Sequence, residues 1–244
     1  MRSTLLLMRP STPEAGRGRG GMKARPILFS TPMVKALLED RKGQTRRPVT
    51  GKALEWLAPE MFTPAFVADR ENGMCKYGYP GDLLWVRETT EVDEDTHDTI
   101  PLSRFVADGK PVLYSGCSDP EYNGSVAHWD YPRNSRPSIH MERWASRLTL
   151  RITEVRVERL NAISEEDAMQ EGCAWDTLYV AYVPGSFSPD HHKTYSSAYK
   201  ALWESINGPG SWDANPWVWV ISFEVIHANV DSVICDHQKA VVEG

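Results

Sequence analysis

The segment Ser146–Leu160 restricts the fold of this chain more than any other part of the sequence. Every second residue from Leu148 to Ile152 is apolar, as in a strand with one buried face. From Val155 onward the apolar positions slip by one residue, which would turn the later side chains to the opposite face unless the strand contains a bulge. We therefore predict a long strand that bends near Thr153, as strands do at the corners of small β-barrels.

The remaining pattern also favours β-structure. Trp217–Ile226 is apolar on both faces at its start, which indicates a central strand. Shorter strands are predicted at Ile27–Phe29, Gln44–Val49, Leu83–Glu88, Leu102–Ala107 and Pro111–Tyr114, and helices at Thr31–Arg41, Ser164–Glu171 and Lys193–Ile206. These elements follow no regular β-α-β rhythm. The predicted fold class is therefore mostly β with α: a small, mainly antiparallel β-barrel with two or three short helices.

The chain has the length of one domain that carries insertions. Residues 1–21 contain prolines and a Gly-Arg run that cannot bury an apolar face, so we expect a disordered leader, with Met22 as an alternative natural start. The domain is expected to span residues 22–227. Long irregular stretches predict insertions at about 50–75, 89–143 and 173–192, and residues 228–244 read as a loosely held C-terminal tail.

Composition excludes several classes of protein. No apolar run approaches the roughly 18 residues of a membrane span, and the N-terminal apolar run is too short for a signal peptide, so we expect a cytoplasmic protein without a membrane partner. The four cysteines form no Cys-x-x-Cys pair, and the adjacent His191 and His192 have no third ligand nearby. We expect no metal and no cofactor. The net charge of −6 means that any nucleic-acid binding requires a local basic cluster.

The first candidate site is the basic turn from Arg41 to Arg47, which holds four cations around one hydroxyl. Lys42 lies three residues before Thr45, so both side chains can face one pocket. A neutral lysine amine can take the proton of a threonine hydroxyl and make it a nucleophile for an acyl centre. This requires burial or neighbouring cations to lower the lysine pKa. The alternative is an ordinary solvated basic turn.

Two further candidates lie apart from this turn. Glu171 ends a short predicted helix, where a carboxylate opposes the helix dipole, so it is either functional or an ordinary surface glutamate. Trp85, Arg87 and Glu88 lie on one predicted strand. Trp85 and Arg87 share a face and are candidates to stack on and hold a base, with a core tryptophan beside an ion pair as the alternative.

A fourth cluster combines arginines with aromatic residues. Its basic members are Arg133, Arg136, His140, Arg143, Arg147 and Arg151, and Trp129, Tyr131 and Trp144 lie among them. Basic residues interleaved with aromatic rings are typical of a nucleic-acid-binding strip. A solvated face explains the same pattern.

Four segments of the chain, in this order, resemble the ASCH-domain proteins of the PUA-like superfamily, in particular the long ASCH proteins of bacterial prophages. They are Met22–Arg47, Pro80–Glu88, Leu150–Glu171 and Trp217–Val225. The smallest members of the family include amidohydrolases that remove the acetyl group from N4-acetylcytidine. Their catalytic lysine, threonine and glutamate correspond to Lys42, Thr45 and Glu171.

The resemblance implies an amidohydrolase that acts on an acylated nucleobase or nucleoside without a metal. In this reading Lys42 is the general base, Thr45 the nucleophile, and Glu171 either assists proton transfer or orients the amine. The expected substrate-binding residues are Arg41, Arg46, Trp85, Arg87 and Glu88, and the expected nucleic-acid-binding residues are Arg47, Arg136, Arg143 and Arg147. The family also implies two alternatives: a non-catalytic module that binds RNA or a modified base, and a ribonuclease.

Overall fold

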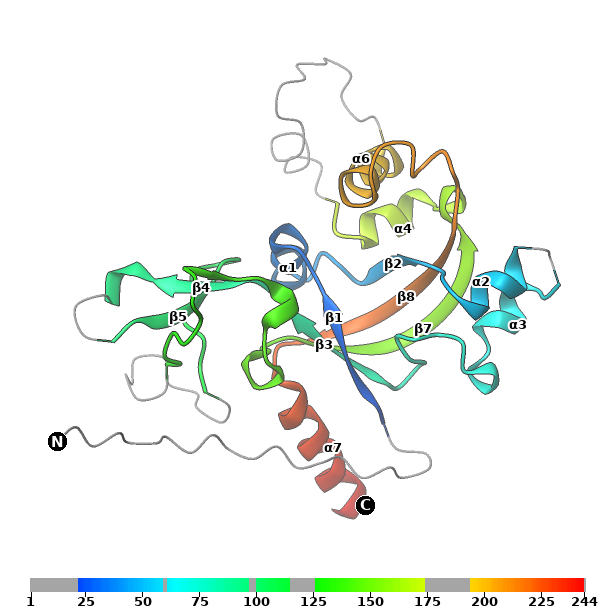
Figure 1. The fold of residues 1–244 in the computed structure, drawn as a ribbon. Helices are drawn as coiled ribbons and strands as arrows, with labels where there is room; N and C mark the ends of the chain where they lie inside the picture. The colour runs from blue at the N-terminus through cyan, green and yellow to red at the C-terminus, as the bar shows by residue number, and fades with distance from the viewer. Residues whose placement is uncertain (1–21, 59–60, 97–99, 115–125, 174–193, 244) are drawn as a thin grey trace.

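A computed structural model describes residues 22–58, 61–96, 100–114, 126–173 and 194–243 of the chain. The main element is a strongly curved five-stranded sheet with the strand order β1-β3-β7-β8-β2 (Figure 1). Its strands are β1 (Ala24–Leu28), β3 (Leu83–Arg87), β7 (Thr149–Arg159), β8 (Trp217–Ile226) and β2 (Gln44–Pro48). β1 pairs with β3 in parallel, and the other pairs are antiparallel.

The predicted bend in the long strand is confirmed. β7 pairs with β8 along its whole length, and the register shifts between Ile152 and Glu154, which leaves Thr153 without an opposite residue. The residues on both sides of the shift remain buried on the side that faces the core, as Ile152 and Val157 show. A one-residue bulge therefore keeps the apolar positions of β7 inward while the strand curves.

The expected closed barrel is not present among the described residues, and the fold is a mixed α/β arrangement. β1 and β2 are the two edges of the main sheet, and no backbone pairing joins them. Instead the Arg47 guanidinium crosses the seam, where Nη2 donates to the carbonyl oxygen of Leu28 at 2.7 Å. Phe29 and helix α1 (Thr31–Leu38) follow β1, and Phe29 and Met33 of this segment line a cavity that Arg47 also lines.

Six α-helices lie in the described part of the chain, more than the two or three that were expected. Besides α1 they are α2 (Lys52–Leu57), α3 (Pro64–Ala68), α4 (Glu165–Gln170), α6 (Tyr195–Asn207) and α7 (Val230–Glu243). α4 and α6 lie together above β2 and β8, while α2 and α3 lie at the far end of β7 (Figure 1). The helices α4 and α6 thus stand beside the open seam.

The two described insertions have different structures. In residues 50–75, helices α2 and α3 insert Leu57 and Val67 into the main core, so this segment completes the core of the domain. The described residues of 89–143 form a second sheet of β5 (Leu102–Phe105), β4 (Thr90–Asp93) and β6 (Ser135–Arg136), with a small core of its own. Most of the third expected insertion, at 173–192, and the expected leader, 1–21, lie outside the described residues.

The C-terminal segment is not the loose tail that was expected. Residues Val230–Glu243 form helix α7, which lies on the side of the main sheet away from α4 and α6 and contacts it through its first turns (Figure 1). Val230 is fully buried, and with Val233 it packs against Leu83 and Trp85 of β3. The segment is therefore held by apolar contacts. Neither α7 nor any other described helix has both the length and the apolar character that crossing a membrane requires.

Gly172, two residues after the end of α4, gives a test of how closely this segment approaches its neighbours. Its φ is +83°, and an added Cβ would lie 2.8 Å from the Ala36 Cβ and 3.0 Å from the Lys42 Cβ. Gly172→Ala therefore adds a steric clash to left-handed backbone strain, and we expect the free energy of unfolding to fall by roughly 2–4 kcal/mol in urea titrations.

Gly73→Ala is the matched control. Gly73 has a φ of +63° and nothing within 4 Å of an added Cβ, so only the backbone strain applies, roughly 1–2 kcal/mol. Equal losses in the two variants would show that the close packing around Gly172 does not contribute.

Candidate active site

A buried ion pair joins the strand β2 side of the seam to helix α4. Lys42 Nζ lies 2.8 Å from Glu171 Oε2 and donates a second hydrogen bond, of 2.7 Å, to the Glu171 carbonyl oxygen. The two residues also form an isolated antiparallel bridge. Lys42 and Glu171 are only 1% and 2% exposed. Two residues that lie 129 positions apart in the chain are thus held together away from solvent.

Local sequence explains this approach. The Ser164 hydroxyl accepts a hydrogen bond from the Asp167 backbone N–H and so caps the start of α4, and Glu171 is the C-cap that follows the last helical residue, Gln170. Gly43 donates its backbone N–H to the Gln170 carbonyl at 3.0 Å. A Cβ at position 43 would lie 2.5 Å from Gln170 Oε1, so a larger residue there would require the end of the Gln170 side chain to move.

Arg46 fixes the Glu171 carboxylate from the other side. Its Nη1 donates to Glu171 Oε1 at 3.2 Å and to Gln44 Oε1 at 2.6 Å. Its Nε and Nη2 contact Glu158, and Nη2 also contacts Asp167 at 2.8 Å. All five guanidinium N–H groups are therefore used within the protein. Arg46, expected to bind substrate, has no donor left for it and instead positions Glu171.

Burial governs the protonation of Lys42. Loss of hydration lowers the pKa of Lys42 from the ordinary lysine value, and the attraction of Glu171, which acts in the opposite sense, does not restore it. The Glu171 carboxylate is shared with Arg46, which weakens its hold on the Lys42 proton. Arg47 lowers the Lys42 pKa further. A lysine of this kind can release its proton more readily than an exposed one.

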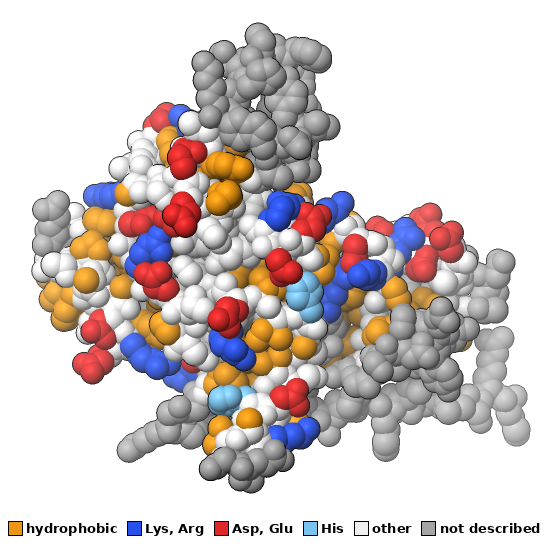
Figure 2. Space-filling model, turned by 180° about the vertical axis from the view of Figure 1, so that it is seen from behind, with side chains coloured by type: hydrophobic (Ala, Val, Ile, Leu, Met, Phe, Trp, Pro, Cys, Tyr) orange, Lys and Arg blue, Asp and Glu red, His pale blue; other side chains and the backbone are white. Residues whose placement is uncertain are grey.

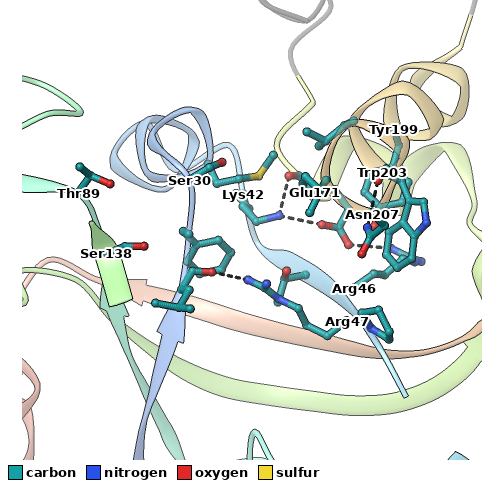
Figure 3. A pocket seen from close by; sticks show the side chains of 17 residues that line it. Ser30, Lys42, Arg46, Arg47, Thr89, Ser138, Glu171, Tyr199, Trp203 and Asn207 are labelled. Atoms are coloured by element: carbon teal, nitrogen blue, oxygen red, sulfur yellow. Dashed lines mark hydrogen bonds and ion pairs between the residues drawn. The ribbon is translucent and has the colours of Figure 1, made fainter. Parts of the chain in front are cut away.

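The ion pair lies at a cavity of about 320 Å³ along the open seam. Lys42, Thr45, Arg46, Arg47 and Glu171 all contribute to its wall. In Figure 3 the ion pair lies between Thr89 and Ser138 on one side and the residues of α6 on the other. This volume is that of a typical small-molecule site, roughly 300 Å³ or more.

Thr45 is buried in this wall, but its hydroxyl makes no hydrogen bond to Lys42 or to any other described residue. The structure therefore brings the expected lysine, threonine and glutamate to one cavity without the contact that a nucleophile and its base require. Such contacts often tighten only when a substrate binds.

The far wall of the cavity was not recognised in the sequence. Tyr199 and Trp203 of α6 are 3% and 4% exposed and face Phe29 and Met33 across the seam. Burial raises the pKa of Tyr199 well above its ordinary value, so its phenol stays protonated. The spacing of Tyr199 and Trp203 on one helical face predicts only a core stripe, and nothing local in the sequence distinguishes a cavity wall from a core.

Cys173, a buried neighbour of the ion pair, is not a ready nucleophile. Burial raises the pKa of its thiol to about 12, and the charge of Glu171 adds to this rise. At neutral pH the group is a thiol, which is far less nucleophilic than a thiolate.

Four of the expected substrate-binding residues lie outside the cavity wall. Trp85 packs beneath α7, and the Arg87 guanidinium lies 5.3 Å from the Trp85 ring centroid. Glu88 is buried in an ion pair with Arg147, at 2.9 Å. Arg41 bonds to Glu39 and to the Gly172 carbonyl. Their contacts are therefore structural.

Of the expected nucleic-acid-binding arginines, three are paired with acidic residues and one lines the cavity. Arg143 pairs with Asp231 of α7, Arg147 with Glu88, and Arg136 with Asp130. On the face drawn in Figure 2, Lys and Arg side chains are interspersed with Asp and Glu, and no extended basic area is visible. Among the four, only Arg47 lines the cavity, and it has no acidic partner among the described residues.

Within the described ranges, no group of three or more His, Cys, Asp or Glu side chains is placed to hold a metal ion. His191 and His192, the adjacent histidines of the sequence, lie outside those ranges. Comparison of the chain with protein-family models, with curated proteins and with solved structures gave no match.

The lowered pKa of Lys42 predicts a pH-dependent stability. In the unfolded chain a lysine keeps its proton up to about its ordinary pKa of 10.5, whereas folded Lys42 loses it at a lower pH. Between these two values the unfolded state binds more protons, so stability rises with pH. We expect the free energy of unfolding of the wild type, relative to Lys42→Met, to increase as the pH approaches 10.5 in denaturant titrations.

Comparison with Lys42→Met cancels the contributions of those tyrosines and cysteines that titrate in the same range without interacting with Lys42, which leaves out Cys173. Lys35→Met removes an exposed lysine from α1 and is the matched control for the loss of a charge. The lowered pKa of Lys42 would be contradicted if the stability of the wild type relative to Lys42→Met fell with rising pH. It would also be contradicted if the stability of the wild type relative to Lys35→Met rose by the same amount.

Proposed function

We propose that the protein is an amidohydrolase that removes an acyl group from the exocyclic amine of a nucleobase or nucleoside, as N4-acetylcytidine carries it. One observation supports this most strongly: the Lys42 amine is buried beside Glu171 in the wall of a cavity that Thr45 also lines. The resemblance of the chain to ASCH-domain proteins supports the same assignment, and with it a PUA-like fold and a cytoplasmic location.

In the proposed reaction Lys42 Nζ accepts the proton of the Thr45 hydroxyl. Thr45 Oγ1 then attacks the acyl carbonyl carbon and forms a tetrahedral oxyanion. When the C–N bond breaks, the ammonium of Lys42 returns the proton to the departing amine, and the acyl group remains on Thr45. A water molecule then attacks this ester, Lys42 accepts its proton, and the carboxylic acid leaves as Thr45 regains its hydrogen.

Glu171 has a positioning part in this scheme. Two acceptors of Glu171 hold the Lys42 amine in place, and Arg46 holds the carboxylate in turn. The Arg46 contact also moderates the negative charge that would otherwise keep Lys42 protonated. A base with a pKa closer to neutrality transfers protons more effectively than an ordinary lysine.

A second candidate function is a module that binds RNA or a modified base without turnover. The observation in its favour is that Lys42 already donates hydrogen bonds to two oxygen atoms of Glu171, while the Thr45 hydroxyl is hydrogen-bonded to neither Lys42 nor Glu171. In this case the ion pair would shape the cavity and take no part in proton transfer. The ribonuclease alternative gains nothing from the cavity wall, which contains no histidine among the described residues.

Turnover of N4-acetylcytidine, followed by chromatography, tests the proposal. We expect Lys42→Met and Thr45→Val each to lower kcat/KM by about 100-fold or more, because a general base and its nucleophile contribute at least that much. Thr45→Ser retains a hydroxyl and should keep a measurable part of the activity.

Lys35→Met is the control, since it makes the same change on the exposed face of α1. Circular dichroism confirms that each variant is folded. If the wild type binds the nucleoside without deacylating it, or if Lys42→Met retains full turnover, the hydrolase assignment is wrong and the binding module is favoured.

A further inference from the structure

Arg47 is the one cation of the cavity wall whose binding capacity the described protein does not use. Its guanidinium makes a single hydrogen bond, from Nη2 to the Leu28 carbonyl, and has no ion pair among the described residues. A guanidinium carries five N–H donors, so most of them remain free. Lys42 and Arg46, by contrast, are both paired with Glu171.

The Nε atom of Arg47 is buried and has no hydrogen-bond partner. A buried donor without a partner costs free energy, on the order of 1–3 kcal/mol, and is therefore uncommon unless something else satisfies it. The indole Nε1 of Trp203, in the same cavity wall, is also buried and unpartnered. Both of these unpartnered groups in the wall are donors, so the matching ligand group is rich in acceptors.

The Arg47 guanidinium lies near the Lys42 amine in the cavity wall. The Lys42 Nζ atom lies 5.7 Å and the Arg47 Cζ atom 5.1 Å from the centroid of the same Phe29 ring. Lys42 is almost fully buried, whereas Arg47 is partly exposed. Lys42 and Arg47 therefore both lie close to one ring of the cavity wall, so a single ligand can contact both.

From these contacts we propose that Arg47 binds a phosphate group of the substrate, so that the cavity takes a phosphorylated nucleoside in preference to a neutral one. Arginine recognises phosphate through paired N–H groups in a planar fork, and the free donors of Arg47 include such a pair. The choice of phosphate over another oxyanion rests on the proposed function, because phosphate is the anionic group that a nucleoside ordinarily carries.

Binding of the deacylated products tests this inference without relying on turnover. Isothermal titration calorimetry of the full chain compares cytidine with cytidine 5′-monophosphate for the wild type, Arg47→Gln and Arg47→Lys. We expect the wild type to bind the monophosphate at least about tenfold more tightly, Arg47→Gln to lose this preference, and Arg47→Lys to keep part of it.

Arg151→Gln is the matched control, since it removes an arginine charge from an exposed pair with Glu224 outside the cavity wall. It should leave the preference unchanged. Equal binding of the two ligands by the wild type, or a preference that survives in Arg47→Gln, would overturn the inference. So would a complete lack of binding of the monophosphate at millimolar concentration.

The ratio of kcat/KM for N4-acetylcytidine 5′-monophosphate to that for N4-acetylcytidine separates this inference from the proposed reaction. Any effect of Arg47 on the Lys42 pKa cancels in this ratio. Arg47-dependent binding without turnover supports the phosphate site and refutes the hydrolase. Turnover of both substrates, with the same ratio in Arg47→Gln as in the wild type, supports the hydrolase and refutes the phosphate site. If a cytidine trinucleotide binds more tightly than the monophosphate, the phosphate belongs to an RNA ligand. If the trinucleotide binds more weakly, the phosphate belongs to a free nucleotide.

Discussion

The candidate site depends on one interaction, the buried contact between the Lys42 amine and Glu171. Removing a cation from water costs several kcal/mol, and a partner carboxylate offsets this cost only in part. The lowered pKa of Lys42 indicates that desolvation is the larger effect here, even with Glu171 at 2.8 Å. A chain that required only stability would place an apolar residue at this position. A buried, perturbed lysine beside a cavity is instead a common feature of functional sites.

The open seam between β1 and β2 provides the space for this chemistry. A closed barrel would have joined these strands by backbone hydrogen bonds and filled the seam. Here Phe29 and the side chain of Arg47 bridge the edges, and α6 supplies the opposite wall with Tyr199 and Trp203. Helix α4 brings Glu171 to the inner end of the seam.

Sequence reasoning succeeded where the signal is local. The alternation in β7, its slip near Thr153, and the short helix that follows Ser164 each depend on neighbouring residues, and the structure confirms them. The prediction of a closed barrel was wrong. Whether the edge strands β1 and β2 pair depends on the path of the chain after β1, which no local pattern indicates. The contacts of Arg46 with Glu158 and Glu171 join residues 112 and 125 positions apart, so no local pattern indicates them. The meeting of Lys42, Thr45 and Glu171 in one cavity was expected only from the family resemblance.

The central claim, that burial outweighs the attraction of Glu171 and leaves Lys42 easily deprotonated, can be measured directly. In a protein labelled with ¹³C at the lysine ε-carbons, the signal of Lys42 is assigned by its absence in Lys42→Met and followed by NMR as the pH is raised. The account predicts a titration midpoint below the ordinary value of 10.5. A midpoint at or above 10.5 would show that the ion pair holds the proton firmly, and Lys42 would then be a structural cation and no base.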